Sequence, residues 1–183
     1  MKNYIYIFFL ILVTIMIYIN NNILDTKQKL QKQIVEIHSL SIIFNVNDFH
    51  KIEGYSPKKI KCPRYSFIMY VDSMSCTDCI LKTLDKWTTY LETLHNENIA
   101  FYPIFAPSSR TLKSFIYKAK AVKVPYNIYI DSTFILEKNN PSIFHNKFLH
   151  TFMLDSTNNI LVVGNPTQNI KVKYLINNIL QKN

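Results

Sequence analysis

The chain has 183 residues, of which 48% are hydrophobic and 18% charged, and its formal net charge is +9. This length suits one compact domain with a small appendage and excludes two large domains. The 12 Tyr and 12 Phe argue against intrinsic disorder, and glycine occurs only at Gly54 and Gly164, which excludes glycine-rich phosphate loops. The lysines are scattered rather than clustered with aromatic residues, so the positive charge does not indicate nucleic-acid binding.

An uninterrupted apolar run, YIYIFFLILVTIMIYI, lies near the N-terminus from Tyr4 to Ile19. A helix of this length spans roughly 24 Å, a little less than the ~30 Å hydrocarbon core of a bilayer. No small-residue cleavage site follows the run, so we predict an uncleaved anchor over residues 1–22, with a cleaved signal peptide as the alternative. The orientation is left open by the flanking charges, because more lysines follow the span than precede it.

Residues 24–38 place Leu24, Leu30, Ile34 and Ile37 mostly three or four positions apart among Lys and Gln. This spacing predicts an amphipathic helical stalk or linker over residues 23–39. Its few heptad-like steps are too short for a coiled coil, which favours a tether that holds a domain away from the membrane. The compact domain is then predicted over residues 40–183, irregular at first and regular from Pro63 onward.

Short apolar runs alternate with segments of helical periodicity beyond Pro63. We predict strands over residues 65–71, 99–105, 126–130, 151–154 and 160–163, and helices over residues 76–95, 108–120 and 169–180. Asn158-Asn159 is predicted to form a two-residue turn, Asp131 and Asp155 to form turns, and Trp87 to lie in the core. This order of elements predicts an α/β domain with a central mixed sheet.

Two of the three cysteines form the motif Cys76-Thr77-Asp78-Cys79 at the predicted junction of a strand and a helix. Unpaired backbone N–H groups and the positive end of the helix dipole stabilise a thiolate at that position. Two cysteines one helical turn apart can also close a disulfide and so exchange two electrons. In this arrangement Cys76 is the exposed nucleophile and Cys79 resolves the mixed disulfide.

A lone CxxC motif also permits other interpretations. Half of a zinc site would need two further ligands, and the candidates Cys62, His95, His145 and His150 supply no second CxxC and no HxxxH pair. We therefore favour redox chemistry and predict no metal, with a purely structural disulfide as another alternative. Cys62 is predicted to be a buried, inert thiol rather than a third redox partner.

Four segments resemble the thioredoxin-like fold: the strand that ends before the CxxC motif, the helix with Trp87, the strand Pro125–Asp131 and the stretch from Thr151 to Pro166. More narrowly, they are similar to the TlpA/ResA-like redoxins over about Tyr65 to Leu180. The resemblance implies a three-layer fold with a central mixed sheet, in which the strand ending at Asp131 and the next helical segment form an insertion. It also implies a membrane-tethered thiol–disulfide oxidoreductase that faces the periplasm or the cell exterior.

The sequence departs from that family at the motif and at one loop. Ser75 replaces the usual Trp before the first cysteine, and Thr77-Asp78 replaces a Gly-Pro type of pair. The negative charge of Asp78 disfavours a nearby thiolate. The proline that the family places in cis beside the disulfide is missing near Leu149-His150, so we expect a trans backbone there.

Three further residues are candidate modulators of the dithiol. Asp72, at the end of the predicted strand, is either a proton acceptor or, more commonly for such a position, a loop or cap residue. His150 stands at the altered proline position, where its imidazolium would favour a thiolate, or it faces solvent without a role. Thr151 marks a strand edge that could hold a partner protein.

The sequence thus predicts a single-pass protein of the inner membrane whose extracytoplasmic domain exchanges disulfides through Cys76 and Cys79. No cofactor and no nucleic acid are expected, and the substrate is a protein thiol or disulfide. The alternatives are a non-catalytic thioredoxin-like binding module and, third, a thiol peroxidase. The peroxidase pattern PxxxTxxC is met only by Ser73, three residues before Cys76, without the proline.

Overall fold

The computed structural model describes residues 2–38, 40–57, 60, 62–94, 98–144 and 150–181. By internal contacts the chain divides into two units, Met1–Ile37 and His38–Asn183. The first unit is one helix, α1 (Lys2–His38), and its segment Phe9–Lys29 is long and apolar enough to cross a membrane. The predicted anchor and stalk are therefore parts of one helix, and the boundary between them stays a prediction.

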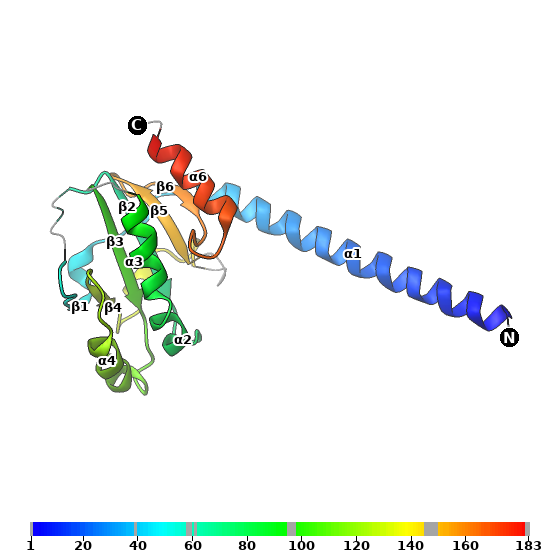
Figure 1. Ribbon diagram of the computed structural model, residues 1–183, viewed down its shortest axis with the longest axis horizontal. Helices are drawn as coiled ribbons and strands as arrows, with labels where there is room; N and C mark the ends of the chain where they lie inside the picture. Colours follow the sequence, from blue (N-terminus) through cyan, green and yellow to red (C-terminus); the bar gives the residue numbers. More distant parts are fainter. Residues whose placement is uncertain are drawn as a thin grey trace. The chain divides into compact units, whose positions relative to one another are not determined.

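The second unit is built on a six-stranded mixed sheet with the order β1-β4-β3-β2-β5-β6 (Figure 1). Strand β3 is parallel to both β2 and β4, whereas β1 is antiparallel to β4, and β5 is antiparallel to both β2 and β6. The strands are β1 (His50–Ile52), β2 (Tyr65–Val71), β3 (Ile99–Phe105), β4 (Ile128–Ile130), β5 (Thr151–Asp155) and β6 (Ile160–Val163). All five strands predicted from the sequence are present.

The central strand β2 is buried at all seven positions. Consecutive residues of a strand face opposite sides of the sheet, yet Phe67 and Ile68 are both fully buried. Both faces of the sheet are therefore covered, which is why the strand reads as a continuous apolar run rather than an alternating one.

The helices of the second unit are α2 (Thr77–Leu81), α3 (Leu84–Thr93), α4 (Leu112–Ala121), α5 (Ile135–Asn139) and α6 (Ile170–Gln181). The prediction of one helix over residues 76–95 is wrong, because the chain turns at Lys82-Thr83 between α2 and α3. Both the backbone N–H and the hydroxyl of Thr83 donate to the carbonyl of Ile80, each at 2.8 Å. A Thr side chain that bonds a nearby backbone carbonyl in this way competes with helix continuation.

Aromatic rings dominate the core on the face of the sheet covered by α3. Trp87 is fully buried, as predicted, and stacks on Phe101 with ring centroids 4.5 Å apart. Phe67 meets the Trp87 ring edge-on at 5.7 Å. On the opposite face, Phe44 packs on Tyr102, and Phe144 packs on Tyr70 and Phe152. The sheet is thus the middle layer of three.

The segment between Leu40 and Lys61 is more regular than its sequence predicts. It contains a 3-10 turn, Val46–Asp48, and the edge strand β1, which pairs with β4. Strand β1 has only three residues, and two of them, His50 and Lys51, are exposed. A strand this short and polar shows no periodicity from which it could be predicted.

The hairpin between β5 and β6 depends on the carboxylate of Asp155. Its Oδ1 accepts hydrogen bonds from the N–H and hydroxyl of Thr157 and from the N–H of Asn159, and its Oδ2 accepts from the Asn159 amide. The turn lies at Ser156-Thr157, where the N–H of Asn158 donates to the carbonyl of Asp155, so the predicted two-residue turn at Asn158-Asn159 is wrong in position. Asn158 adopts a left-handed conformation with φ of 64°. Burial acts to raise the pKa of Asp155, but the hydrogen bonds outweigh it and leave this pKa below the usual value. The prediction of Asp155 as a turn former is confirmed.

We expect Asp155→Asn to lower the free energy of unfolding by about 1 kcal/mol at pH 7, because two accepting oxygens become one. The pKa of Asp155 is lower in the folded state than its unfolded value of ~3.9. The wild type's advantage is therefore full above that value and is lost as the pH falls through the folded pKa. Urea unfolding followed by Trp87 fluorescence at pH 7 and pH 2.5 measures it, with Asp85→Asn as control. An equal difference at both pH values would contradict the prediction.

Candidate functional site: the Cys76–Cys79 disulfide

Cys76 and Cys79 form a disulfide with their Cα atoms 5.3 Å apart. Cys76 is the N-cap residue of α2 and Cys79 lies in its first turn, so the predicted junction of strand and helix is observed. Both residues are exposed, and they follow β2 by a short loop. The most deeply buried strand of the sheet thus holds an accessible disulfide at its carboxyl end.

Asp72 organises the loop between β2 and the disulfide. Its Oδ1 accepts hydrogen bonds from the N–H of Met74 at 3.0 Å, the N–H of Ser75 at 2.8 Å and the Ser75 hydroxyl at 2.7 Å. Asp72 itself is buried. These contacts are typical of a loop-forming residue, and they fix the backbone that leads into Cys76. A proton-accepting role for Asp72 stays a prediction.

The first turn of α2 directs unpaired N–H groups toward the disulfide end of the helix. The first backbone hydrogen bond of this turn runs from the N–H of Ile80 to the carbonyl of Cys76 at 3.1 Å. The preceding N–H groups at positions 77, 78 and 79 consequently have no partner within the helix. Because α2 has only five residues, these local dipoles rather than a long helix supply the stabilisation of a thiolate.

The charge of Asp78, which by itself disfavours a nearby thiolate, has a counter-charge in the structure. Lys118 Nζ, on α4, lies 2.5 Å from Asp78 Oδ2. Both side chains are about half exposed, so the pair is screened by solvent rather than deeply buried. Lys118 was missed because forty residues separate it from Asp78, and only the packing of α4 beside α2 brings the two together.

His150 and Thr151 lie at the start of β5, next to the end of β2. The His150 ring is buried between Tyr70 and Phe144, with centroid distances of 5.7 and 5.3 Å, and its carbonyl accepts from the N–H of Tyr70. This rules out the solvent-facing alternative. Burial, followed by the nearby carboxylate of Glu137, raises the pKa of Tyr70. Thr151 pairs with Met69 of β2 on one side, and its carbonyl accepts from the N–H of Gly164 on the other, so the prediction of an open strand edge at Thr151 is wrong. An effect of either residue on the thiols stays a prediction.

The remaining predictions concern the missing proline, Cys62 and the zinc alternative. No peptide bond among the described residues is cis, and Phe148 and Leu149 of the loop lie outside those residues. The prediction that Cys62 is buried is wrong, since this free cysteine is exposed. It lies in an irregular segment before β2, not in the apolar strand itself. His95 and His145, two of the zinc candidates, lie outside the described residues.

We expect Lys118→Met to raise the pKa of the reduced Cys76 thiol by roughly half a unit, because the carboxylate of Asp78 is no longer neutralised. Exposed ion pairs contribute only about 0.2–1 kcal/mol, and ~1.4 kcal/mol corresponds to one pKa unit. The pH dependence of iodoacetamide alkylation measures this shift.

The double variant Lys118→Met/Asp78→Asn is the control for that measurement. It should restore a pKa close to that of the wild type, since both charges are then absent. Lys113→Met, on an exposed position of the same helix, should leave the pKa unchanged. Equal effects of Lys118→Met with and without Asp78 would show that the ion pair does not act on the thiol.

Comparison with known proteins gives only remote structural similarities. No family model and no curated protein matches the chain. The solved structures it resembles include a thioredoxin-like protein from Bacteroides caccae, with 10% identity and a TM-score of 0.48 over 85% of this chain and 55% of that one, so the chain spans about half of that protein. StoA from Bacillus subtilis has 15% identity and a TM-score of 0.41 over 69% and 96% of the two chains.

A thioredoxin-like protein from Aeropyrum pernix has 12% identity and a TM-score of 0.45 over 87% of this chain and 98% of that one. The fold follows from the strand order of the chain itself. A central strand runs into a CxxC helix, two parallel strands follow on one side of it, and an antiparallel hairpin lies on the other. By this arrangement the domain has a thioredoxin-like fold of the α/β class.

Proposed function

We propose that this chain is a thiol–disulfide oxidoreductase that exchanges disulfides with another protein through Cys76 and Cys79. The observation that supports the proposal is the exposed disulfide at the end of a buried central strand. A disulfide that only stabilised the fold would gain most by closing a long loop, whereas this one closes a loop of sequence separation 3. Its accessibility serves exchange rather than stability.

The exchange proceeds in two balanced steps. In the reducing direction, the Cys76 thiolate attacks a disulfide sulfur of the substrate, the substrate S–S bond breaks, and one substrate sulfur leaves as a thiolate. The Cys79 thiolate then attacks the Cys76 sulfur of the mixed disulfide. This second step forms the Cys76–Cys79 bond and releases the other substrate thiolate, so two electrons pass to the substrate. Oxidation of a substrate dithiol is the reverse sequence.

Cys76 is assigned as the attacking residue because of its place in the helix. As the N-cap residue it precedes the first turn, so the unpaired N–H groups of that turn lie on its side. Asp72 fixes the loop on the other side of Cys76 through Ser75. Cys79 is already part of the helix and is placed to complete the exchange from within it.

The proposal predicts that Cys76→Ser abolishes the reduction of insulin disulfides, whereas Cys79→Ser accumulates mixed disulfides because the resolving thiol is missing. Activity assays and non-reducing gels of the reduced full chain in detergent measure the two effects. Cys62→Ser is the matched control and should retain wild-type activity. In the reduced chain, iodoacetamide should modify Cys76 before Cys79 and Cys62.

Two outcomes would point to the alternative functions. If the wild type does not reduce insulin disulfides and neither cysteine variant differs from it, a non-catalytic binding module is favoured. Turnover of hydrogen peroxide that depends on Cys76 but not on Cys79 would favour a peroxidase. Labelling of Cys62 before Cys76 would contradict the assignment of the nucleophile.

The proposal includes an uncleaved membrane anchor and a domain on the extracytoplasmic side. It is supported by the apolar span within α1 and by the redox chemistry, since disulfides persist in oxidising compartments. The chain should remain in the membrane fraction at high salt with residues 1–22 intact. Externally added protease should digest the domain in spheroplasts. Protection from protease would place the domain in the cytoplasm and contradict this part of the proposal.

A further inference from the structure

Among the described residues, the outer edge of strand β3 has no backbone partner over most of its length. Its inner edge pairs with β2 at all seven positions, from Ile99 to Phe105. On the outer side, β4 pairs only with Ile104 and Phe105. The sheet therefore has a notch beside the first residues of β3, at the end of the strand remote from the disulfide.

The notch exists because the chain before β4 is bound elsewhere. The N–H of Tyr55 donates to the carbonyl of Val124 at 3.0 Å, and the N–H of Gly54 donates to the Asn127 side chain at 3.3 Å. A Cβ atom on Gly54 would lie 2.2 Å from the Tyr126 carbonyl oxygen. Only glycine allows this close approach, which holds residues 124–127 against residues 54–55 instead of against β3.

The backbone groups that face the notch follow from the alternation of the strand. The carbonyl of Phe105 accepts from Asp131, next to β4, while the N–H of Ala106 donates to Val71 of β2. Phe101 and Ile99 have the same parity as Phe105, so their N–H and C=O groups face outward. Pro103 fits this parity, because its missing N–H would also point outward. In the described chain no backbone hydrogen bond reaches the outward groups of Ile99 or Phe101.

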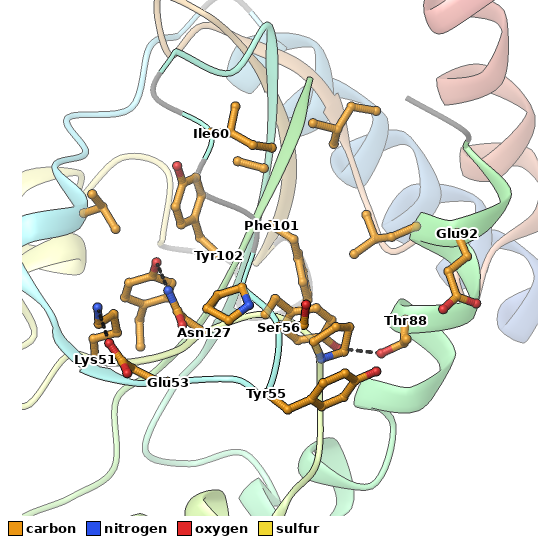
Figure 2. A pocket seen from close by; sticks show the side chains of 18 residues that line it. Lys51, Glu53, Tyr55, Ser56, Ile60, Thr88, Glu92, Phe101, Tyr102 and Asn127 are labelled. Carbon is orange, nitrogen blue, oxygen red and sulfur yellow. Dashed lines mark hydrogen bonds and ion pairs between the residues drawn. The ribbon is translucent and has the colours of Figure 1, made fainter. Parts of the chain in front are cut away.

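A cavity of about 590 Å³ lies along this edge, within the ~300–1,000 Å³ range of ligand sites. Side chains from both faces of the sheet line it, as expected for a space beside a strand edge. Figure 2 shows Phe101 and Tyr102 extending from β3 to different sides, with Thr88 and Glu92 of α3 at one wall. Side chains that line the cavity therefore lie on both sides of the row of outward backbone groups of β3.

The walls of the cavity are aromatic and already anchored. The Tyr126 hydroxyl donates to the carbonyl of Leu84 at 2.7 Å, and its ring meets Phe101 edge-on at 4.8 Å. Burial raises the pKa of both Tyr126 and Tyr102 above the usual value of a phenol, which is itself neutral at pH 7. Tyr102 and Tyr129 line the cavity on the face of the sheet opposite Phe101, and their rings are 5.6 Å apart.

The charges at the rim favour a basic ligand on one side. Lys51 and Glu53 form an ion pair at 2.9 Å and largely offset each other. The exposed carboxylate of Glu92, on the α3 side, forms no ion pair with any described residue. A cationic side chain beside Glu92 would also place its apolar stem against Phe101 and Tyr126, whose rings line the same cavity.

We propose that the notch binds an extended segment of a partner protein, which adds to β3 as a strand through the backbone of Ile99 and Phe101. The segment carries a Lys or Arg on the α3 side, facing Glu92, and an apolar residue at the adjacent position, facing Tyr102 and Tyr129. Strand addition takes its affinity from main-chain hydrogen bonds and its specificity from alternate side chains. This binding is separate from the proposed exchange at Cys76.

The test uses an acetylated and amidated hexapeptide library with the oxidised full chain in detergent. We expect enrichment of peptides with a basic residue next to an apolar one. N-methylation of the best peptide at alternate residues should split by parity. Residues whose N–H faces β3 should lose about tenfold in affinity per methyl group, and residues of the other parity should lose little. Parity-independent binding would overturn the proposal.

Variants of the chain give an independent test. Ile99→Pro removes one outward N–H at the first residue of the strand, where proline is tolerated, and should weaken peptide binding about tenfold. The matched control Ile99→Val keeps the N–H and should bind normally. Glu92→Gln should weaken Lys-containing peptides roughly threefold to fivefold without affecting their Ala analogues, and Asp85→Asn on the same helix should have no effect.

Three further results would overturn the proposal, and one would leave it standing without the exchange function. The absence of any enriched peptide would overturn it, as would equal binding to wild type and to a folded Ile99→Pro variant. Self-association of the chain that Ile99→Pro abolishes would assign the edge to a second copy instead. Retained peptide binding by Cys76→Ser, even in the absence of oxidoreductase activity, would show that the notch functions independently of the disulfide.

Discussion

The burial of β2 on both faces is the constraint on which the other parts of the domain depend. A seven-residue strand with no exposed position requires a covering layer on each side, here the α3 face around Trp87 and the opposite face around Phe44 and Phe144. Neighbouring strands must also satisfy its backbone along both edges, as β3 and β5 do. The segment that contains β2 reaches solvent only at the two ends of the strand, so exposed reactive groups of this segment, such as the disulfide, can lie only there.

At the carboxyl end, the exit from the core is controlled by Asp72. Its buried carboxylate accepts three hydrogen bonds from the loop, so the chain reaches Cys76 in a fixed geometry despite having no regular structure there. The Asp78–Lys118 pair then joins α2 to α4. A dithiol held in this way on a short helix depends on its neighbours for electrostatic support, because a five-residue helix has little dipole of its own.

The sequence allowed prediction of the elements whose signal is local. Five apolar strands, the turn-forming Asp155, the core position of Trp87 and the strand-to-helix place of the CxxC motif follow from short-range patterns. The break at Thr83, the exposed Cys62 and strand β1 were not predicted, because each is decided by packing or by too few residues. Lys118 and the β3 notch could not be found from sequence, since they depend on segments forty or more residues apart.

The two polar ends of the sheet are far enough apart to act separately. In the β2–β3 ladder, Tyr65 pairs with Ile99 at one end and Val71 with Phe105 at the other, and seven residues at ~3.3 Å each place these ends roughly 20 Å apart. An extended segment bound at Ile99 would need about six further residues to reach the disulfide. A partner can therefore be held at the notch while a different part of it meets Cys76. The effective concentration of its thiol would then depend on linker length rather than on contacts at the disulfide.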